Sequence, residues 1–171
     1  MKKKYFEGSL LTLGASLWWG IIGVIYFKFV SFANPIELVI HRTIWTAVIL
    51  IITTFYLSKW IFFFRLFKNI KIVFFLFISG ILVMVNWLTW LYAISIDKLV
   101  DASFGYYIFP IFSVFFGVIF LKENYNKNKI LAVFLVFISI VYLYFQNTSF
   151  PWIGLTVALT FSVYGLIRKK I

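Results

Sequence analysis

Apolar residues run through this chain in six long stretches that are separated by short polar breaks. The stretches cover roughly residues 6–31, 36–57, 71–95, 102–121, 130–146 and 152–167. A helix needs about 20 residues to cross a bilayer, so the pattern predicts an all-α, polytopic membrane protein with about six transmembrane helices. The last two stretches are short for this span. The breaks leave no room for a separate soluble domain, so we expect one membrane domain.

The composition agrees with this class. Apolar residues make up 64% of the chain and charged residues 12%, whereas a soluble domain is nearer half apolar and a quarter charged. The lipid bilayer is therefore the expected partner. The net charge of +11 does not indicate nucleic-acid binding, because the basic residues occur in short loops between apolar stretches. The absence of cysteine excludes disulfides and thiolate metal sites.

No pattern of an enzyme is present. The sequence has one histidine and five carboxylates, with no phosphate-binding glycine loop, no paired carboxylates at a workable depth in the membrane and no spacing of metal ligands. We therefore expect no catalytic residues, no cofactor and no metal.

The basic residues predict the orientation of the helices. If six helices cross the membrane, all of the 16 lysines and arginines except Lys28, Arg42 and Lys98 fall on the side of the two termini. Basic loops are retained in the cytoplasm. Both termini are thus predicted to be cytoplasmic.

The first apolar stretch carries an unusual edge of small residues. Gly8, Thr12, Ser16 and Gly20 recur every four residues, which predicts close approach of a neighbouring helix. Residues 162–167 also resemble 17–22 when Gly165 is aligned with Gly20. The two helices would run in opposite directions, and inverted repeats are common in secondary transporters, with the binding site at the interface between repeats.

The second stretch places ionisable groups within the membrane. Arg42 lies about two helical turns from the outer end, roughly 9 Å deep. It either lines a cavity as a cation for an anionic or polar substrate group, or snorkels and pairs with an acidic residue to hold helices together. Candidate partners are Glu37, Asp97 and Asp101. His41 is interpreted as a hydrogen-bonded packing residue rather than a proton carrier.

The third stretch combines an amide with two indoles at Asn86, Trp87 and Trp90. Such a set either joins helices by hydrogen bonds, belongs to an interfacial aromatic belt, or forms the wall of an aromatic binding pocket.

The fourth stretch predicts a kinked helix. Asp101 is a candidate N-cap, and Gly105 allows close packing. Pro110 has no N–H and frees the carbonyl of Tyr106 one turn earlier. A free acceptor within the membrane needs a partner, which favours a kink that lines a cavity over an ordinary packing kink.

These motifs resemble the RarD-type permeases, in the EamA branch of the drug/metabolite transporter superfamily. The similarity covers nearly the whole chain and rests on motifs in the same order and spacing. These motifs are Trp19-Gly20, His41-Arg42, Asn86-Trp87, Ala102 to Tyr106 with Pro110, Leu121 to Glu123, and Tyr164 to Lys170.

The resemblance implies ten helices in two inverted five-helix EamA repeats around a central cavity. Residues 1–150 would form the first repeat, and 151–171 the first helix of a second, truncated repeat. It also implies a permease of the bacterial inner membrane for small organic metabolites or drugs. The group is named for chloramphenicol sensitivity. The residues implied to line or shape the cavity are Trp19, His41, Arg42, Asn86, Trp87, Tyr106 and Pro110.

We therefore expect a secondary transporter for a small-molecule substrate, as a fragment of a ten-helix protein. Two alternatives stay open. The chain could be a truncated repeat that does not transport, or that works only by pairing with a second copy or a missing C-terminal half. It could also be a scaffold that docks through the small residues of its first helix.

Overall fold

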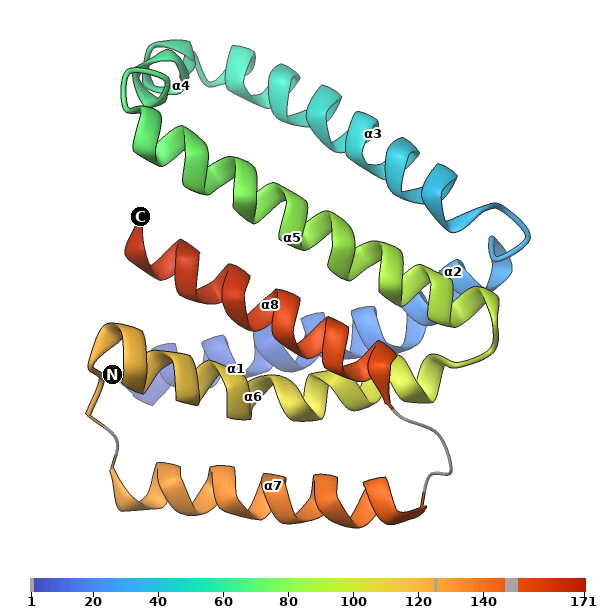
Figure 1. The fold of residues 1–171 in the computed structure, drawn as a ribbon. Helices are drawn as coiled ribbons and strands as arrows, with labels where there is room; N and C mark the ends of the chain where they lie inside the picture. Colours follow the sequence, from blue (N-terminus) through green and yellow to red (C-terminus); the bar gives the residue numbers. More distant parts are fainter. Residues whose placement is uncertain (1, 125, 147–150) are drawn as a thin grey trace.

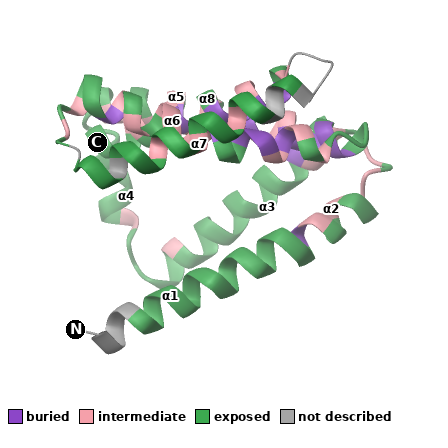
Figure 2. Cartoon of the chain, turned by 90° about the horizontal axis from the view of Figure 1, so that it is seen from below, coloured by how far each residue is buried: buried purple, intermediate pink, exposed green. Residues whose placement is uncertain are grey.

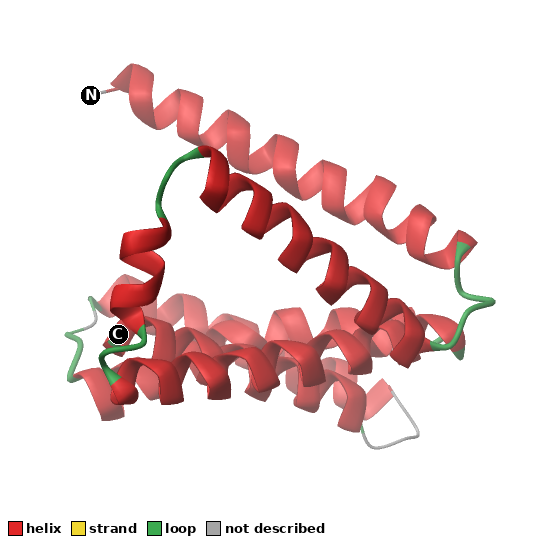
Figure 3. Cartoon of the chain, turned by 90° about the horizontal axis from the view of Figure 1, so that it is seen from above, coloured by secondary structure: helices red, strands yellow, loops and turns green. Residues whose placement is uncertain are grey.

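The chain folds almost entirely into helices. The computed structural model describes residues 2–124, 126–146 and 151–171, and these contain helices and loops but no strand (Figure 3). The elements are α1 (Lys2–Leu17), the π-helical segment η1 (Trp18–Gly23), α2 (Val24–Phe29), α3 (Pro35–Tyr56), α4 (Trp60–Leu66), α5 (Ile70–Ser95), α6 (Leu99–Leu121), α7 (Lys127–Gln146) and α8 (Trp152–Lys170).

Four helical segments within the described residues are long and apolar enough to cross a membrane. They are Phe6–Phe29, which runs through α1, η1 and α2, together with α3, α5 and α6. A shorter apolar segment, Ile130–Tyr142, lies within α7. The predicted class, an all-α polytopic membrane protein, is confirmed. That α7 and α8 also cross stays a prediction.

Two asparagines start the long helices. The Asn34 side chain accepts a hydrogen bond from the Ile36 N–H at 2.9 Å, and Pro35 occupies the first turn of α3. The Asn69 side chain accepts from the N–H groups of Lys71 and Ile72 at the start of α5. Both contacts satisfy backbone donors that a helix start leaves unpaired.

The predicted N-cap at Asp101 is wrong. The helix α6 begins at Leu99, so Asp101 lies inside its first turn. A carboxylate is favourable there as well, because the helix dipole is positive at this end. The sequence analysis also missed α4, a short aromatic helix in the break between the second and third stretches.

The helices run back and forth between two ends of the molecule. Figure 1 shows both termini, α4 and the chain after α6 at one end, and the turns after α2 and α5 at the other. The lysine-rich breaks thus lie at the same end as the termini, as the alternation of six stretches predicts.

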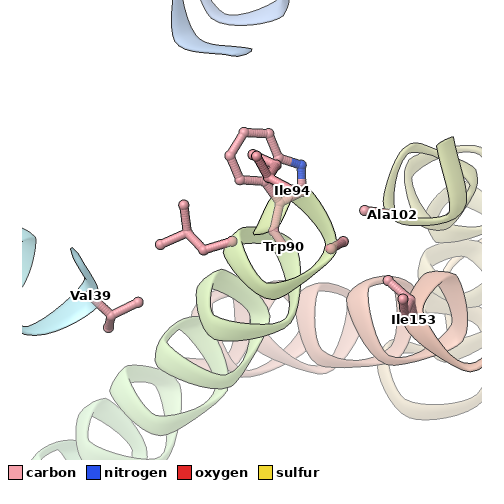
Figure 4. Close-up of a cluster of buried hydrophobic side chains, with 7 residues drawn as sticks. Val39, Trp90, Ile94, Ala102 and Ile153 are labelled. Carbon is pink, nitrogen blue, oxygen red and sulfur yellow. The ribbon is translucent and has the colours of Figure 1, made fainter. Parts of the chain in front are cut away.

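Most buried residues belong to α5, α6 and α8. Figure 2 shows them gathered in the layer that these helices form, whereas α1 and α3 diverge from it and are largely exposed. In the main cluster, drawn in Figure 4, Trp90 and Ile94 of α5 lie between Val39 of α3 and the pair formed by Ala102 of α6 and Ile153 of α8. The outer surface is rich in exposed phenylalanine, leucine and isoleucine, which suits contact with lipid.

The closest helix approach is between α6 and α8. A Cβ atom built on Gly105 would lie 2.5 Å from the Gly154 carbonyl oxygen and 2.9 Å from the Val157 Cβ. The glycines of the first membrane segment, by contrast, have no such neighbour, since a Cβ at Gly8 of α1 or Gly20 of η1 would meet nothing within 4 Å. The predicted packing edge on the first helix is therefore unpartnered in this structure, and a glycine pair on α6 and α8 makes the close contact.

Candidate functional site

Four aromatic side chains from three elements form one cluster beside α5. Trp19 of η1 and Trp87 of α5 lie edge to face with ring centroids 5.4 Å apart. Phe27 of α2 lies 5.4 Å from Trp90, and Trp87 lies 5.7 Å from Trp90. Edge-to-face pairs at such distances are favourable beyond the area they bury. The cluster joins the first membrane segment to α5.

Trp19 is positioned by an irregular stretch of helix. Residues Trp18–Gly23 form a π-helix, and such segments occur frequently at functional sites. Gly23 is buried beneath the indole, because a Cβ there would lie 3.3 Å from the Trp19 Cε3 atom. The missing side chain of Gly23 thus leaves room for the Trp19 ring.

Arg42 of α3 covers the other side of this cluster. Its guanidinium carbon lies 3.1 Å from the centroid of the Trp87 ring, a cation–π contact of the kind that arginine favours. Tyr106 of α6 lies near Arg42. The site therefore combines a cation, an indole face and a phenol.

Arg42 has no carboxylate partner among the residues that the structure describes. Within the described ranges the ion pairs are Lys28–Asp97, with an N–O distance of 3.3 Å, and Lys169–Glu123. Asp97, one of the partners considered for Arg42, is thus paired with the first membrane segment. The interpretation of Arg42 as one half of a structural ion pair has no support here.

A groove of ≈ 700 Å³ opens beside Arg42, between α3, α5 and α8. Its walls are mainly aliphatic and aromatic. Its polar side chains are Arg42, Thr43, Thr46, Ser79, Tyr164 and Arg168. An apolar cavity of this size with a few polar groups is typical of small-molecule sites.

Asn86 lies behind this groove and joins α5 to α8. It is buried, and its Nδ2 donates to the Val157 carbonyl oxygen at 2.9 Å and to the Thr160 hydroxyl at 3.0 Å. The Asn86 amide thus forms hydrogen bonds between helices, which is the first of the three interpretations that the sequence left open for this residue. It is not among the residues that line the groove.

Ser162 of α8 makes a similar link to α6. It is buried, and its hydroxyl lies 3.3 Å from the Phe109 carbonyl oxygen and 2.7 Å from that of Ala158. Phe109 directly precedes Pro110, so α8 contacts α6 beside its proline.

The structure brings some of the predicted cavity residues together. Trp19, Arg42 and Trp87 form one contiguous site, and Tyr106 lies near it. His41 on α3 and Pro110 on α6 belong neither to the aromatic cluster nor to the lining of the groove. That these residues act on a substrate stays a prediction.

The sequence analysis did not single out Ser79, Tyr164 or Arg168 as lining residues. The available signal for Ser79 is a lone serine within an apolar run. Arg168 enters the sequence interpretation only through membrane orientation and through the family motif from Tyr164 to Lys170. The part of the chain that the structure describes contains no group of three histidine or acidic side chains suited to a metal.

Comparisons with known proteins agree on one family. The model of the EamA-like transporter family matches residues 6–145. The chain is 35% identical to the protein RarD of Salmonella typhi over 169 residues, which are 99% of this chain and 57% of that protein. It is 31% identical to the uncharacterized transporter YojE of Bacillus subtilis, over 96% of this chain and 56% of that protein. The chain thus spans little more than half the length of these relatives. No solved structure matches.

Proposed function

The chain belongs to the EamA-like transporter family, as a member of the RarD type, and on this basis we propose that it forms part of a membrane permease for small organic molecules. The names of its relatives point to transport rather than to an enzyme. The proposed location is a bacterial inner membrane, crossed several times.

The observation that carries the proposal is the position of Arg42. A charged side chain within a membrane segment costs about 2.5–3.5 kcal/mol on insertion scales and therefore marks a functional site by default. Arg42 sits on an indole, has no carboxylate partner within the described ranges, and lines a groove large enough for a small organic molecule.

The proposed mechanism is alternating access around this groove. Trp87, the member of the aromatic cluster that lines the groove, supplies a face on which a planar molecule stacks, and Arg42 attracts a polar or anionic group. Both termini are proposed to be cytoplasmic, so the Arg42 end of the groove lies toward the outer side. No ATP site or metal is part of this proposal.

Transport by the purified chain tests the proposal. The 171-residue chain would be reconstituted into liposomes, and uptake of radiolabelled chloramphenicol, chosen because the RarD group is named for sensitivity to it, would be compared with that of empty liposomes. We expect uptake above the background and its reduction by Arg42→Ala. Arg65→Ala, on α4 and away from the groove, should transport normally. If liposomes with correctly inserted protein take up no more chloramphenicol than empty liposomes, the result would count against transport of this compound by the chain alone.

A paired arrangement is the second candidate. The diverging helices α1 and α3 expose apolar faces, and α1 carries an unpartnered row of small residues. A second copy of the chain, or a C-terminal half, would cover them. Cross-linking of single-cysteine variants on α1 into dimers within the membrane would support pairing, and transport by a demonstrated monomer would exclude it.

A further inference from the structure

The groove has a second polar end, where Ser79 of α5 lies. Ser79 is 4% exposed, lines the groove, and its hydroxyl has no hydrogen-bond partner among the described residues. Buried hydroxyls are nearly always hydrogen-bonded, and leaving one unpaired is costly. The wall of the groove therefore contains a hydroxyl whose hydrogen-bonding capacity is unused among the described residues.

Arg168 of α8 also lines the groove. It is one of three basic residues in the last turn of α8. The other two contact the end of α6 and the loop that follows it. Lys169 pairs with Glu123, just after α6, and the Lys170 ammonium lies 5.9 Å from the centroid of the Phe120 ring. Arg168 belongs to no ion pair within the described ranges. Membrane orientation accounts for three basic residues at this end, but not for one of them lining a groove.

Ser79 and Arg168 lie at the same level of the groove. The helices α5 and α8 run in opposite directions (Figure 1), and Asn86 is bonded to Val157 and Thr160. Ser79 lies seven residues before Asn86, and Arg168 lies eight residues after Thr160. At a rise of 1.5 Å per residue, Ser79 lies about 11 Å from Asn86 along α5, and Arg168 lies about 12 Å from Thr160 along α8. Both displacements are toward the same end of the two helices.

We propose that Arg168 and Ser79 bind the carboxylate of a small organic anion, whose apolar body lies along the groove toward Trp87. A guanidinium offers a planar pair of donors that fits a carboxylate, and the Ser79 hydroxyl adds a third donor. The apolar walls exclude water and strengthen these bonds. This inference rests on the proposed function and names the substrate class of its groove.

Binding of a matched pair of probes tests the substrate class. The full chain in lipid nanodiscs would be assayed by equilibrium dialysis with radiolabelled 4-phenylbutyrate and with its neutral amide, 4-phenylbutyramide. We expect the carboxylate to bind at least about tenfold more tightly than the amide, since hydrogen bonds to a charged group are roughly twice as strong as neutral ones. Equal binding of the two probes, or no binding of the carboxylate, would overturn the proposal.

Three variants locate the site. Arg168→Gln should weaken carboxylate binding about tenfold and leave amide binding unchanged. Ser79→Ala should weaken it several-fold without lowering the melting temperature, because the variant removes a buried hydroxyl that has no partner. Arg65→Gln removes an arginine away from the groove and should bind the carboxylate normally.

Carboxylate binding that survives Arg168→Gln and Ser79→Ala would overturn the assignment, whatever the transport result. Conversely, if 4-phenylbutyrate binds through Arg168 and Ser79 but is not taken up by liposomes that contain the chain, the result would contradict the proposed transport function alone. The two failures are therefore distinguishable.

Discussion

The guanidinium of Arg42 lies over the indole of Trp87, with its central carbon 3.1 Å from the ring centroid. The two residues come from α3 and α5, and Trp87 in turn contacts Trp19 of the first membrane segment. The cation–π contact thus joins α3 to α5, and the contact between the two indoles adds the first membrane segment.

A double-mutant cycle should detect this contact. Arg42→Met and Trp87→Leu, singly and together, should show a coupling free energy of about 0.5–2 kcal/mol, the range of cation–π contacts. The measurement is the free energy of unfolding in mixed micelles of mild detergent and dodecyl sulfate. Arg65→Met combined with Trp87→Leu is the control and should be additive. If the effects of Arg42→Met and Trp87→Leu on the free energy of unfolding are additive, the contact contributes nothing to stability.

Substitution of Gly105 should separate α6 from α8. Gly105→Ala would place a methyl group 2.5 Å from the Gly154 carbonyl oxygen, and overpacking of this kind costs about 1–3 kcal/mol. We expect a lower melting temperature in micelles. Gly165→Ala on α8 adds a methyl group with nothing within 4 Å and should be tolerated. Equal melting temperatures for the two variants would contradict the close approach.

Asn86 should be coupled to Thr160. Interhelical hydrogen bonds in membranes contribute about 0.6 kcal/mol on average and up to about 1.7 kcal/mol. Asn86→Leu and Thr160→Val should show coupling in this range when unfolding free energies are compared. Asn86→Leu with Thr53→Val, whose hydroxyl bonds within α3, should be additive. No coupling in the first pair would show that the Nδ2–Oγ1 bond does not form in the membrane.

Single cysteines should report the orientation of the chain, because it has none of its own. Asn126→Cys lies at the basic end and Ser95→Cys at the other. A thiol reagent that does not cross the inner membrane should label Ser95→Cys in intact cells, and Asn126→Cys only after lysis. The reverse pattern would place both termini outside.

The sequence was sufficient for the fold class, because long apolar stretches admit few structures other than membrane helices. It also identified Trp19, Arg42 and Trp87 as notable residues. It did not indicate which helices pack together. The repeat of Gly8, Thr12, Ser16 and Gly20 is a stronger local pattern than Gly105 and Gly154, yet the close contact forms at the second pair. Residues 105 and 154 are far apart along the chain, so their complementarity exists only once α6 and α8 are adjacent.

Arg168 shows the same limitation in another way. Its place in a basic cluster at the end of an apolar stretch has a sufficient explanation in membrane orientation. Neither composition nor spacing distinguishes it from Lys169 and Lys170. The distinction depends on the rotation of α8 about its axis, which packing against α5 and α6 determines.

The position of α8 has a consequence for biosynthesis. This helix is made last among the described residues, yet it fills the space between α5 and α6 with Ile153, Val157 and Ala158, each at most 1% exposed. When α5 and α6 leave the ribosome, Asn86 and Gly105 have no partner from the same chain. These two helices must therefore wait in the bilayer, or against an insertion factor, until α8 (Trp152–Lys170) is synthesised. The assembly of the earlier helices is in this way coupled to the synthesis of α8.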